Sequence, residues 1–316
     1  MSLNKNFTEN YLATEKLSLI LGVTAVFVAF FGIYTPLKIA IFFVSCPLFY
    51  SYMTLGNRSG NISSAFFSLI LFFAVPFKTF FDVFLNIIAP AVLIGYSSNR
   101  YIIQNRKKWW YPESFLLRDL ILLSLFSVIF LSLTFYRHDI ILKPYAEALK
   151  NFQGLDLNKP MYLSPFIKYA VGIGIAVKIF GSIASFRIAQ IISVKRKKNL
   201  RPKFNFLDLS IPNWLAVLPL LSLALVITLD NILTFDDNLS LLHVLGGVFV
   251  ISSLAPMICG FSLMHKLSEE SKREWVLIFL YFLLVFATPF VILSMFFLGI
   301  VDSFYDFRTR FAKAEK

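Results

Sequence analysis

The chain has 316 residues, of which 58% are hydrophobic and only 15% are charged, and its net charge is +12. Soluble globular chains are typically about 45–50% apolar and about 25% charged. This composition excludes an ordinary soluble domain and predicts an integral membrane protein. The basic residues cluster beside apolar runs, where they fix orientation, so no nucleic-acid partner is expected and the lipid bilayer is the expected surroundings.

The apolar runs predict an all-α, polytopic membrane bundle. A membrane-spanning helix needs about 20 apolar residues. In chain order, nine candidate segments fall at 17–34, 37–55, 62–76, 77–96, 115–136, 165–193, 212–230, 239–265 and 275–300. The segment 62–76 is barely long enough to span, so eight or nine transmembrane helices are expected. The first helix is expected to be retained, because the polar start "MSLNKNFTENYLATEK" and the later "GIYTPLK" do not form a secretory signal with its cleavage site.

The loops leave no room for a soluble domain, so residues 1–316 are predicted to form a single integral membrane domain. Its longest loop, 137–164, contains "ILKPYAEALKNF". This stretch fits a short amphipathic helix on the membrane surface and an ordinary connecting loop equally well.

The distribution of basic residues predicts the orientation. Four Lys and Arg residues fall within 100–108 and six within 195–203, whereas "DNILTFDDN" at 230–238 has none. Because basic loops stay in the cytoplasm, the first two loops are expected inside, the third outside, and the N-terminus inside. Nine spans would then place the C-terminus outside, although its tail carries Arg308, Arg310, Lys313 and Lys316. Either one segment does not span or the tail is an exception to the rule.

Four ionisable or amide side chains in two predicted helices stand out within the apolar segments. Lys178 lies near the middle of its apolar segment, among small residues that allow neighbouring helices to approach. Asp82 and Asn86 follow Lys78 at intervals of four and form a polar stripe on one helix face. Such groups usually face a bundle interior, a partner or a water-filled path. We expect Lys178, Asp82 and Asn86 to line one cavity, as a structural ion pair or as part of a substrate pathway.

No enzymatic motif is present in the sequence: there is no H-E-x-x-H, no G-x-S-x-G and no Walker-type glycine loop. The histidines His138, His243 and His265 are too dispersed to predict a metal site. No catalytic residue, metal or cofactor is therefore predicted, although an enzyme is not excluded.

The ending "FLGIVDSFYDFRTR" interrupts the last apolar run with charges. Asp302, Asp306 and Arg310 are four residues apart, so on a helix they would share one face. The spacing alone suggests a helix end leaving the bilayer with opposite charges paired along it.

Several stretches in order resemble an uncharacterised bacterial membrane protein family, the YybS-like family. They are "LATEKLSLILGVTAVFVAFFGIYTPL", "AVLIGYSSNRY", "LSIPNWL", "DDNLSLLHVLGG", "PMICGFSLMHKLSEE" and "LGIVDSFYDFRTR". The resemblance covers most of the chain and implies that the polar residues Asp302, Asp306 and Arg308 belong to a family pattern. It carries no established activity.

The opening helices, within residues 1–200, also resemble the substrate-binding membrane subunits of energy-coupling-factor vitamin transporters. In those subunits an Ala-x-x-x-Ala pattern on the first helix docks against a coupling subunit, and Ala25 and Ala29 have that spacing here. The resemblance implies Ala25 and Ala29 as partner contacts and residues 201–316 as a three-helix C-terminal extension.

Two functions follow from this sequence. The first is a multi-pass protein of the bacterial inner membrane that binds or transports a small solute without its own ATPase. The alternative is a non-transporting scaffold or assembly factor that contacts other membrane proteins.

Overall fold

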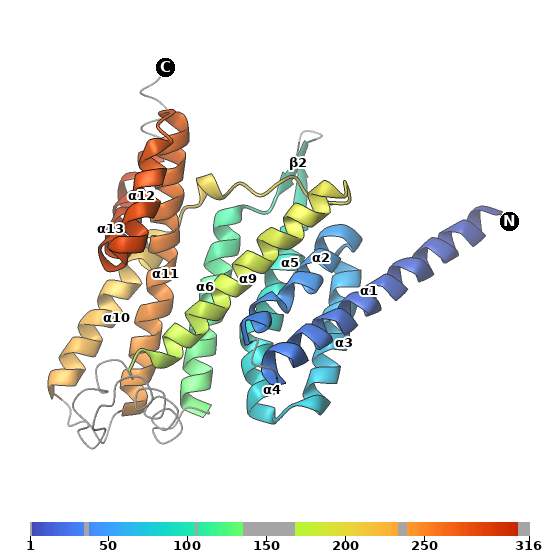
Figure 1. Cartoon of the computed structure of the whole chain (residues 1–316), viewed down its shortest axis with the longest axis horizontal. Helices are drawn as coiled ribbons and strands as arrows, with labels where there is room; N and C mark the ends of the chain where they lie inside the picture. Colours follow the sequence, from blue (N-terminus) through green and yellow to red (C-terminus); the bar gives the residue numbers. More distant parts are fainter. Residues whose placement is uncertain (1, 35–37, 105–106, 135–167, 233–238, 309–316) are drawn as a thin grey trace. The chain divides into compact units, whose positions relative to one another are not determined.

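The computed structural model describes residues 2–34, 38–104, 107–134, 168–232 and 239–308 (Figure 1). The predicted all-α class is confirmed: the described chain is almost entirely helical, and its sheet is a single pair of strands. Within these described ranges, seven helices are long and apolar enough to cross a membrane. The chain is therefore a helical membrane protein, as its composition predicts.

The chain divides into two compact units, each described here by itself. Unit 1 comprises residues 1–112 and 177–204, and unit 2 comprises residues 113–176 and 205–316. The boundary between them falls within one long helix, α9 (Ala170–Lys195). The description of residues 1–316 as one membrane domain with a C-terminal extension beginning at residue 201 stays a prediction.

Unit 1 is built around a short internal helix. Besides α9, its elements are α1 (Ser2–Tyr34), η1 (Lys38–Phe43), α2 (Ser45–Leu55), α3 (Asn57–Ala74), α4 (Phe77–Val83), η2 (Phe84–Ile88), α5 (Ala89–Ser98), β1 (Tyr101–Gln104) and β2 (Lys107–Trp110). Helix α2 has only 11 residues, and α1, α3 and α5 pack around it. The single span predicted over 37–55 is thus wrong, because a 3₁₀ turn and a short α-helix occupy that stretch.

Tyr52 is the centre of this packing. Its ring is fully buried, and a Cβ on either Gly60 or Gly95 would lie within 2.4 Å of it. Only glycine leaves room for the ring between α3 and α5. The Tyr52 hydroxyl donates to Asn61 at 2.7 Å, so its polar end is also satisfied.

Unit 2 is a bundle whose helices approach closely at glycines. It contains the start of α9 together with α6 (Glu113–Thr134), η3 (Phe206–Asp208), α10 (Asn213–Ile232), α11 (Leu239–Glu270), α12 (Trp275–Phe286) and α13 (Thr288–Tyr305). A Cβ on Gly260 would lie 2.0 Å from the carbonyl oxygen of Met295, and one on Gly299 would lie 1.8 Å from that of Pro256. The backbones of α11 and α13 are therefore in direct contact, as expected where small residues line a membrane-helix interface.

The single helix predicted over 275–300 is also wrong. Helix α12 ends at Phe286, Ala287 leaves the helical conformation, and α13 begins at Thr288 with Pro289 in its first turn. Proline cannot donate to the carbonyl four residues earlier, and its ring clashes there, so a continuous helix is disfavoured. In the first turn of a new helix that donor is not needed.

Candidate functional site

A charged pair in unit 1 joins α4 to α9. The ammonium Nζ of Lys178 lies 2.5 Å from both carboxylate oxygens of Asp82. The side chains are 19% and 24% exposed, respectively. The predicted neighbourhood of Lys178 and Asp82 is thus present, and the two charges neutralise each other within the helices.

The depth of this pair follows from its position in two candidate spans. Asp82 is the sixth residue of the span Phe77–Ser98, and Lys178 is the ninth of Ala170–Lys195. At 1.5 Å per residue, they lie about 8 Å and about 12 Å from the starts of their helices. If these candidate spans cross a hydrocarbon core about 30 Å thick, both residues fall within the core rather than at the headgroups. Isolated charges at such depth are costly, which favours their pairing.

Asn86 extends the pair into a three-residue cluster. Its Nδ2 donates to the Asp82 backbone oxygen at 3.0 Å and to Asp82 Oδ1 at 2.9 Å. Asn86 is only 3% exposed. Its Oδ1 accepts no hydrogen bond from any residue that the structure describes. A buried acceptor left in this state is unusual in folded proteins and is normally satisfied by water, an ion or a ligand.

A π-helical turn, η2, presents Asn86 to the pair. The Ala89 N–H donates to the Phe84 oxygen, five residues back, in place of the α-helical bond. Pro90 contributes to this geometry because it has no N–H to donate to the Asn86 carbonyl. Single π turns inside α-helices occur frequently at functional sites. The local sequence therefore places an amide in an irregular turn beside an ion pair.

The polar residues of the C-terminal pattern form a second cluster, in unit 2. Arg308 is 6% exposed and Asp302 is 5% exposed. The guanidinium donates to Asp302 Oδ2 at 2.9 Å, to the Cys259 oxygen at 3.1 Å, to Ser262 Oγ at 3.1 Å and to the Leu207 oxygen. Arg308 therefore ties the end of α13 to α11 and to η3.

The predicted helix face shared by Asp302, Asp306 and Arg310 is interrupted after Tyr305. Helix α13 ends at Tyr305, and Asp306 adopts a left-handed conformation with φ 45°. This turn brings Arg308 back onto Asp302, whereas Arg310 lies outside the described residues. Because the helix ends before Asp306, Asp302 and Asp306 do not share a helix face despite their spacing of four.

Ala25 and Ala29 are fully buried within the chain. Helix α1 packs against α3 and α2, and a Cβ on Gly22 of the same helix would lie 2.9 Å from the Ser63 oxygen of α3. The small residues of α1 thus serve packing inside unit 1, which argues against their use as an open docking face. Their role as partner contacts stays a prediction.

Two further features were missed from the sequence. Lys168 is 93% buried, as its side chain is 7% exposed, and its Nζ lies 2.5 Å from Asp230 Oδ2 in unit 2. Burial raises the pKa of the neighbouring Tyr169, and the charge of Asp230 adds to this shift. Such a pair has no sequence signal, because Lys168 and Asp230 both fall where a side chain can also reach water at a helix end.

The second missed feature is the antiparallel hairpin of β1 and β2 in unit 1, which falls in the predicted basic loop. Tyr101 pairs with Trp110 and Ile102 with Trp109. Two short runs containing β-branched and aromatic residues, separated by two residues, would have indicated such a hairpin.

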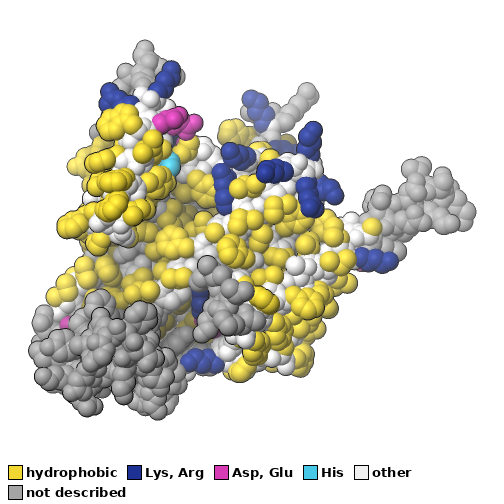
Figure 2. All heavy atoms as spheres, in the orientation of Figure 1, with side chains coloured by type: hydrophobic (Ala, Val, Ile, Leu, Met, Phe, Trp, Pro, Cys, Tyr) yellow, Lys and Arg dark blue, Asp and Glu magenta, His cyan; other side chains and the backbone are white. Residues whose placement is uncertain are grey.

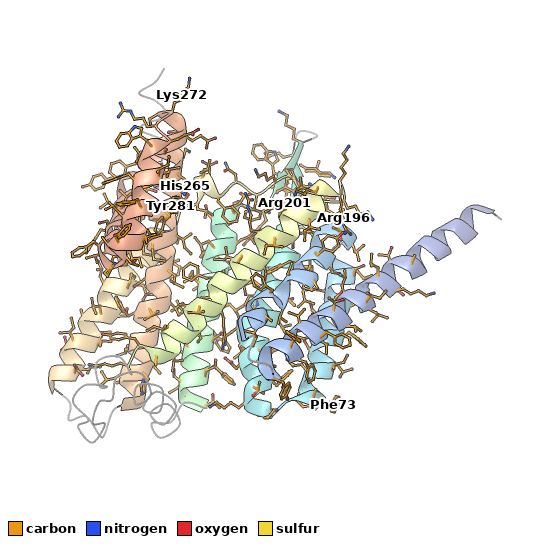
Figure 3. The ribbon with its side chains drawn as sticks, viewed as in Figure 1. Phe73, Arg196, Arg201, His265, Lys272 and Tyr281 are labelled. Carbon is orange, nitrogen blue, oxygen red and sulfur yellow. The ribbon has the colours of Figure 1, made fainter. Side chains whose placement is uncertain are left out.

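His265 in unit 2 has a local partner: its Nε2 lies 2.7 Å from the Tyr281 hydroxyl, across α11 and α12 (Figure 3). In the ranges described above, no three His, Cys, Asp or Glu side chains gather closely enough to hold a metal ion. The cluster of Asp82, Asn86 and Lys178 is the candidate binding site, because its buried Asn86 Oδ1 has no donor among the described residues.

Comparisons of the chain with protein-family models, with curated proteins and with solved structures found no match. The resemblance to the YybS-like family and to transporter substrate-binding subunits stays a prediction. The properties established for this chain are those of a multi-helix membrane protein with a partly buried ion pair in unit 1 and a buried ion pair in unit 2.

Proposed function

We propose that the chain is a multi-pass protein of the bacterial inner membrane that binds a small polar solute at Asp82, Asn86 and Lys178. The observation that supports this function most is the buried Asn86 Oδ1, which meets no donor from the described residues beside an ion pair at membrane depth. A solute with an N–H or O–H group would satisfy this oxygen. Movement of the solute would use no ATPase of the chain's own, because the sequence contains no nucleotide-binding glycine loop.

The pairing itself suggests how a solute could be exchanged. Lys178 and Asp82 together carry no net charge, so the site is not strongly selective for an anion or a cation while the pair is closed. Separating the pair would free a carboxylate and an ammonium at the same place, at the cost of their mutual attraction. A zwitterionic or strongly hydrogen-bonding solute would offset that cost by pairing with both groups.

The test is native mass spectrometry of the full chain purified in mild detergent, with any retained small molecule identified after release. We expect wild type to carry a small solute, and Lys178→Met and Asp82→Asn each to lose it. The matched control is Lys266→Met with Asp208→Asn, which removes a more exposed ion pair of 2.7 Å in unit 2. The control should keep the solute.

The same variants separate binding from folding. Removing one partner of this partly buried pair leaves the other unpaired, so each single change should lower the free energy of unfolding by up to about 3 kcal/mol. The double change should cost less than the sum of the two, because no lone charge remains. Thermal unfolding in detergent measures this directly.

Wild type without any bound solute, or single variants that retain it, would contradict the binding function. Co-purification would then distinguish a transporter subunit from a scaffold. A coupling subunit with an ABC-type ATPase would support a transporter subunit, whereas ribosomal, cell-wall or secretion factors would support the scaffold alternative.

A further inference from the structure

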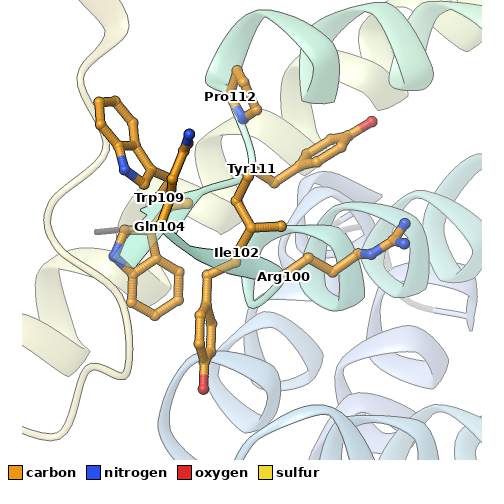
Figure 4. A pocket seen from close by; sticks show the side chains of 8 residues that line it. Arg100, Ile102, Gln104, Trp109, Tyr111 and Pro112 are labelled. Carbon is orange, nitrogen blue, oxygen red and sulfur yellow. The ribbon is translucent and has the colours of Figure 1, made fainter. Parts of the chain in front are cut away.

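The hairpin of β1 and β2 carries exposed aromatic and aliphatic side chains at one end of unit 1. Ile102 is 66% exposed, Ile103 is 68% exposed and Trp109 is 57% exposed. A pocket of about 490 Å³ lies beside them, bounded by Arg100, Tyr101, Ile102, Gln104, Trp109, Trp110, Tyr111 and Pro112 (Figure 4). Apolar side chains exposed in this way are typical of an interaction surface.

Cations cover the aromatic rings of this hairpin. The Nζ of Lys108 lies 4.8 Å from the centre of the Tyr101 ring, and the Arg201 guanidinium carbon lies 6.0 Å from that of Trp110. Tyr101 and Trp110 are themselves 5.1 Å apart across the strands. Arg201 comes from the segment that follows α9, so two distant parts of the chain supply one basic and aromatic surface.

The charge of this surface has one sign. Residues 99–112 and 193–204 contain ten Lys and Arg and no Asp or Glu. In Figure 2, Lys and Arg side chains gather near this end of unit 1, next to apolar surface. Such a surface attracts anions.

The chain also determines where this surface lies. Only Asn99 and Arg100 separate β1 from the span Phe77–Ser98, and only Tyr111 and Pro112 separate β2 from the span Glu113–Thr134. The hairpin is therefore held at the boundary of the hydrocarbon core and cannot move away from it. At that depth the abundant anions are lipid phosphates, and Trp and Tyr are the side chains that favour the headgroup layer.

We propose that the hairpin and residues 195–203 bind the headgroup of an anionic phospholipid. Ile102, Lys107 and Trp109 share one face of the hairpin, because side chains alternate along each strand and Ile102 pairs with Trp109. The phosphate lies beside Lys107, and the glycerol region packs against Trp109 and Ile102. Lys108 and Arg201, on the opposite face, add to the positive potential. This assignment does not depend on the proposed solute site, because it concerns other residues of unit 1 at the membrane surface.

The experiment uses the purified full chain in mild detergent with equal amounts of phosphatidylglycerol and phosphatidylcholine, and counts bound lipids by native mass spectrometry. We expect wild type to bind more phosphatidylglycerol than phosphatidylcholine. Lys107→Gln with Lys108→Gln should reduce this preference by at least about fivefold, the value for one surface cation near an anionic lipid. The matched control is Lys272→Gln with Arg273→Gln, which removes two exposed cations from unit 2 and should leave the preference unchanged.

A second pair of variants tests the aromatic part. Trp109→Ala should lower the occupancy of phosphatidylglycerol, whereas Trp275→Ala, an equally exposed tryptophan at the start of α12, should not. Equal binding of the two lipids by wild type, an unchanged ratio in the Lys107 and Lys108 variant, or an equal loss in the control would overturn the proposal. Retention of a single-stranded RNA by wild type without any lipid preference would also overturn it and identify the surface as a nucleic-acid site.

Discussion

A single side chain, Arg308, connects several elements at the C-terminal end of unit 2. Arg308 has one carboxylate, two backbone oxygens and one hydroxyl as acceptors, which come from three separate elements. A guanidinium can serve this arrangement because its donors form a rigid planar fork. The buried Ser262 hydroxyl in turn donates to the Phe206 oxygen at 2.6 Å. Helix η3 thus accepts one hydrogen bond from Ser262 and one from Arg308.

We therefore expect Arg308→Lys to lower the free energy of unfolding by roughly 3 kcal/mol, despite the unchanged charge. An ammonium has fewer donors and cannot reach all four acceptors, which leaves buried groups unpaired. The matched control is Arg58→Lys, because Arg58 pairs with Glu15 at 3.2 Å and its side chain is 70% exposed. That change should cost less than about 1 kcal/mol. Similar unfolding midpoints for both variants in detergent would contradict the assigned role of Arg308.

At the scale of elements, glycines determine how closely helices pack. Gly260 and Gly299 bring the backbones of α11 and α13 together, and Gly172 meets Gly247 where α9 crosses α11 in unit 2. In lipid, association depends on such close contact because the surrounding acyl chains are as apolar as the side chains. Gly174, two residues after Gly172, has no atom within 4 Å of where its Cβ would lie. On α9, Gly172 thus allows close contact with a neighbouring helix, whereas Gly174 does not.

Replacing glycine with alanine should therefore change the stability in opposite directions at these positions. Gly299→Ala and Gly260→Ala should each destabilise the protein by about 1–3 kcal/mol, because the added methyl meets backbone atoms that cannot move aside. Gly174→Ala should be neutral or stabilising by about 0.5–1 kcal/mol, since alanine is favoured in a helix interior. Thermal unfolding of the three variants in one detergent measures the order. Destabilisation by Gly174→Ala as large as by Gly299→Ala would refute the packing account.

At the scale of the whole molecule, the break between α12 and α13 bears on the topology. Helix α12 has 12 residues and is about 18 Å long, too short to cross a core of about 30 Å. Four residues separate its start at Trp275 from the end of α11 at Glu270. After α13, Arg308 binds Leu207, Cys259 and Ser262, so the chain has returned to the end of unit 2 where η3 lies. Helices α12 and α13 therefore form a pair that begins and ends at the same end of unit 2.

Reporter fusions test this arrangement. Fusions at residues 199 and 316 should report the same side of the membrane, and the basic loops predict that this side is the cytoplasm. A fusion at 105 should agree with them, while one at 235 should report the exterior. Opposite sides for 199 and 316 would show that the last helices cross after all. An even number of crossings would also reconcile the basic tail, with Arg308, Arg310, Lys313 and Lys316, with the orientation of the other loops.

The sequence by itself determined the membrane class, most helix positions and the three residues of the candidate site. Hydrophobic length is a local property, so apolar runs identified most helices, but not the breaks within 37–55 and 275–300. The cost of burying a charge also made Lys178 and Asp82 conspicuous without any structure, because each needs a partner within the bilayer.

Only the tertiary structure decided which groups meet. The π-helical turn that buries Asn86, the return of Arg308 onto Asp302 and the split of residues 275–300 depend on backbone geometry and on neighbours far along the chain. Ala25 and Ala29 are another example. Their spacing predicts a helix face suited to close packing, but it does not tell whether a helix of the same chain or another protein packs there. Residue spacing describes one helix, whereas contacts between helices are set by how the whole unit packs.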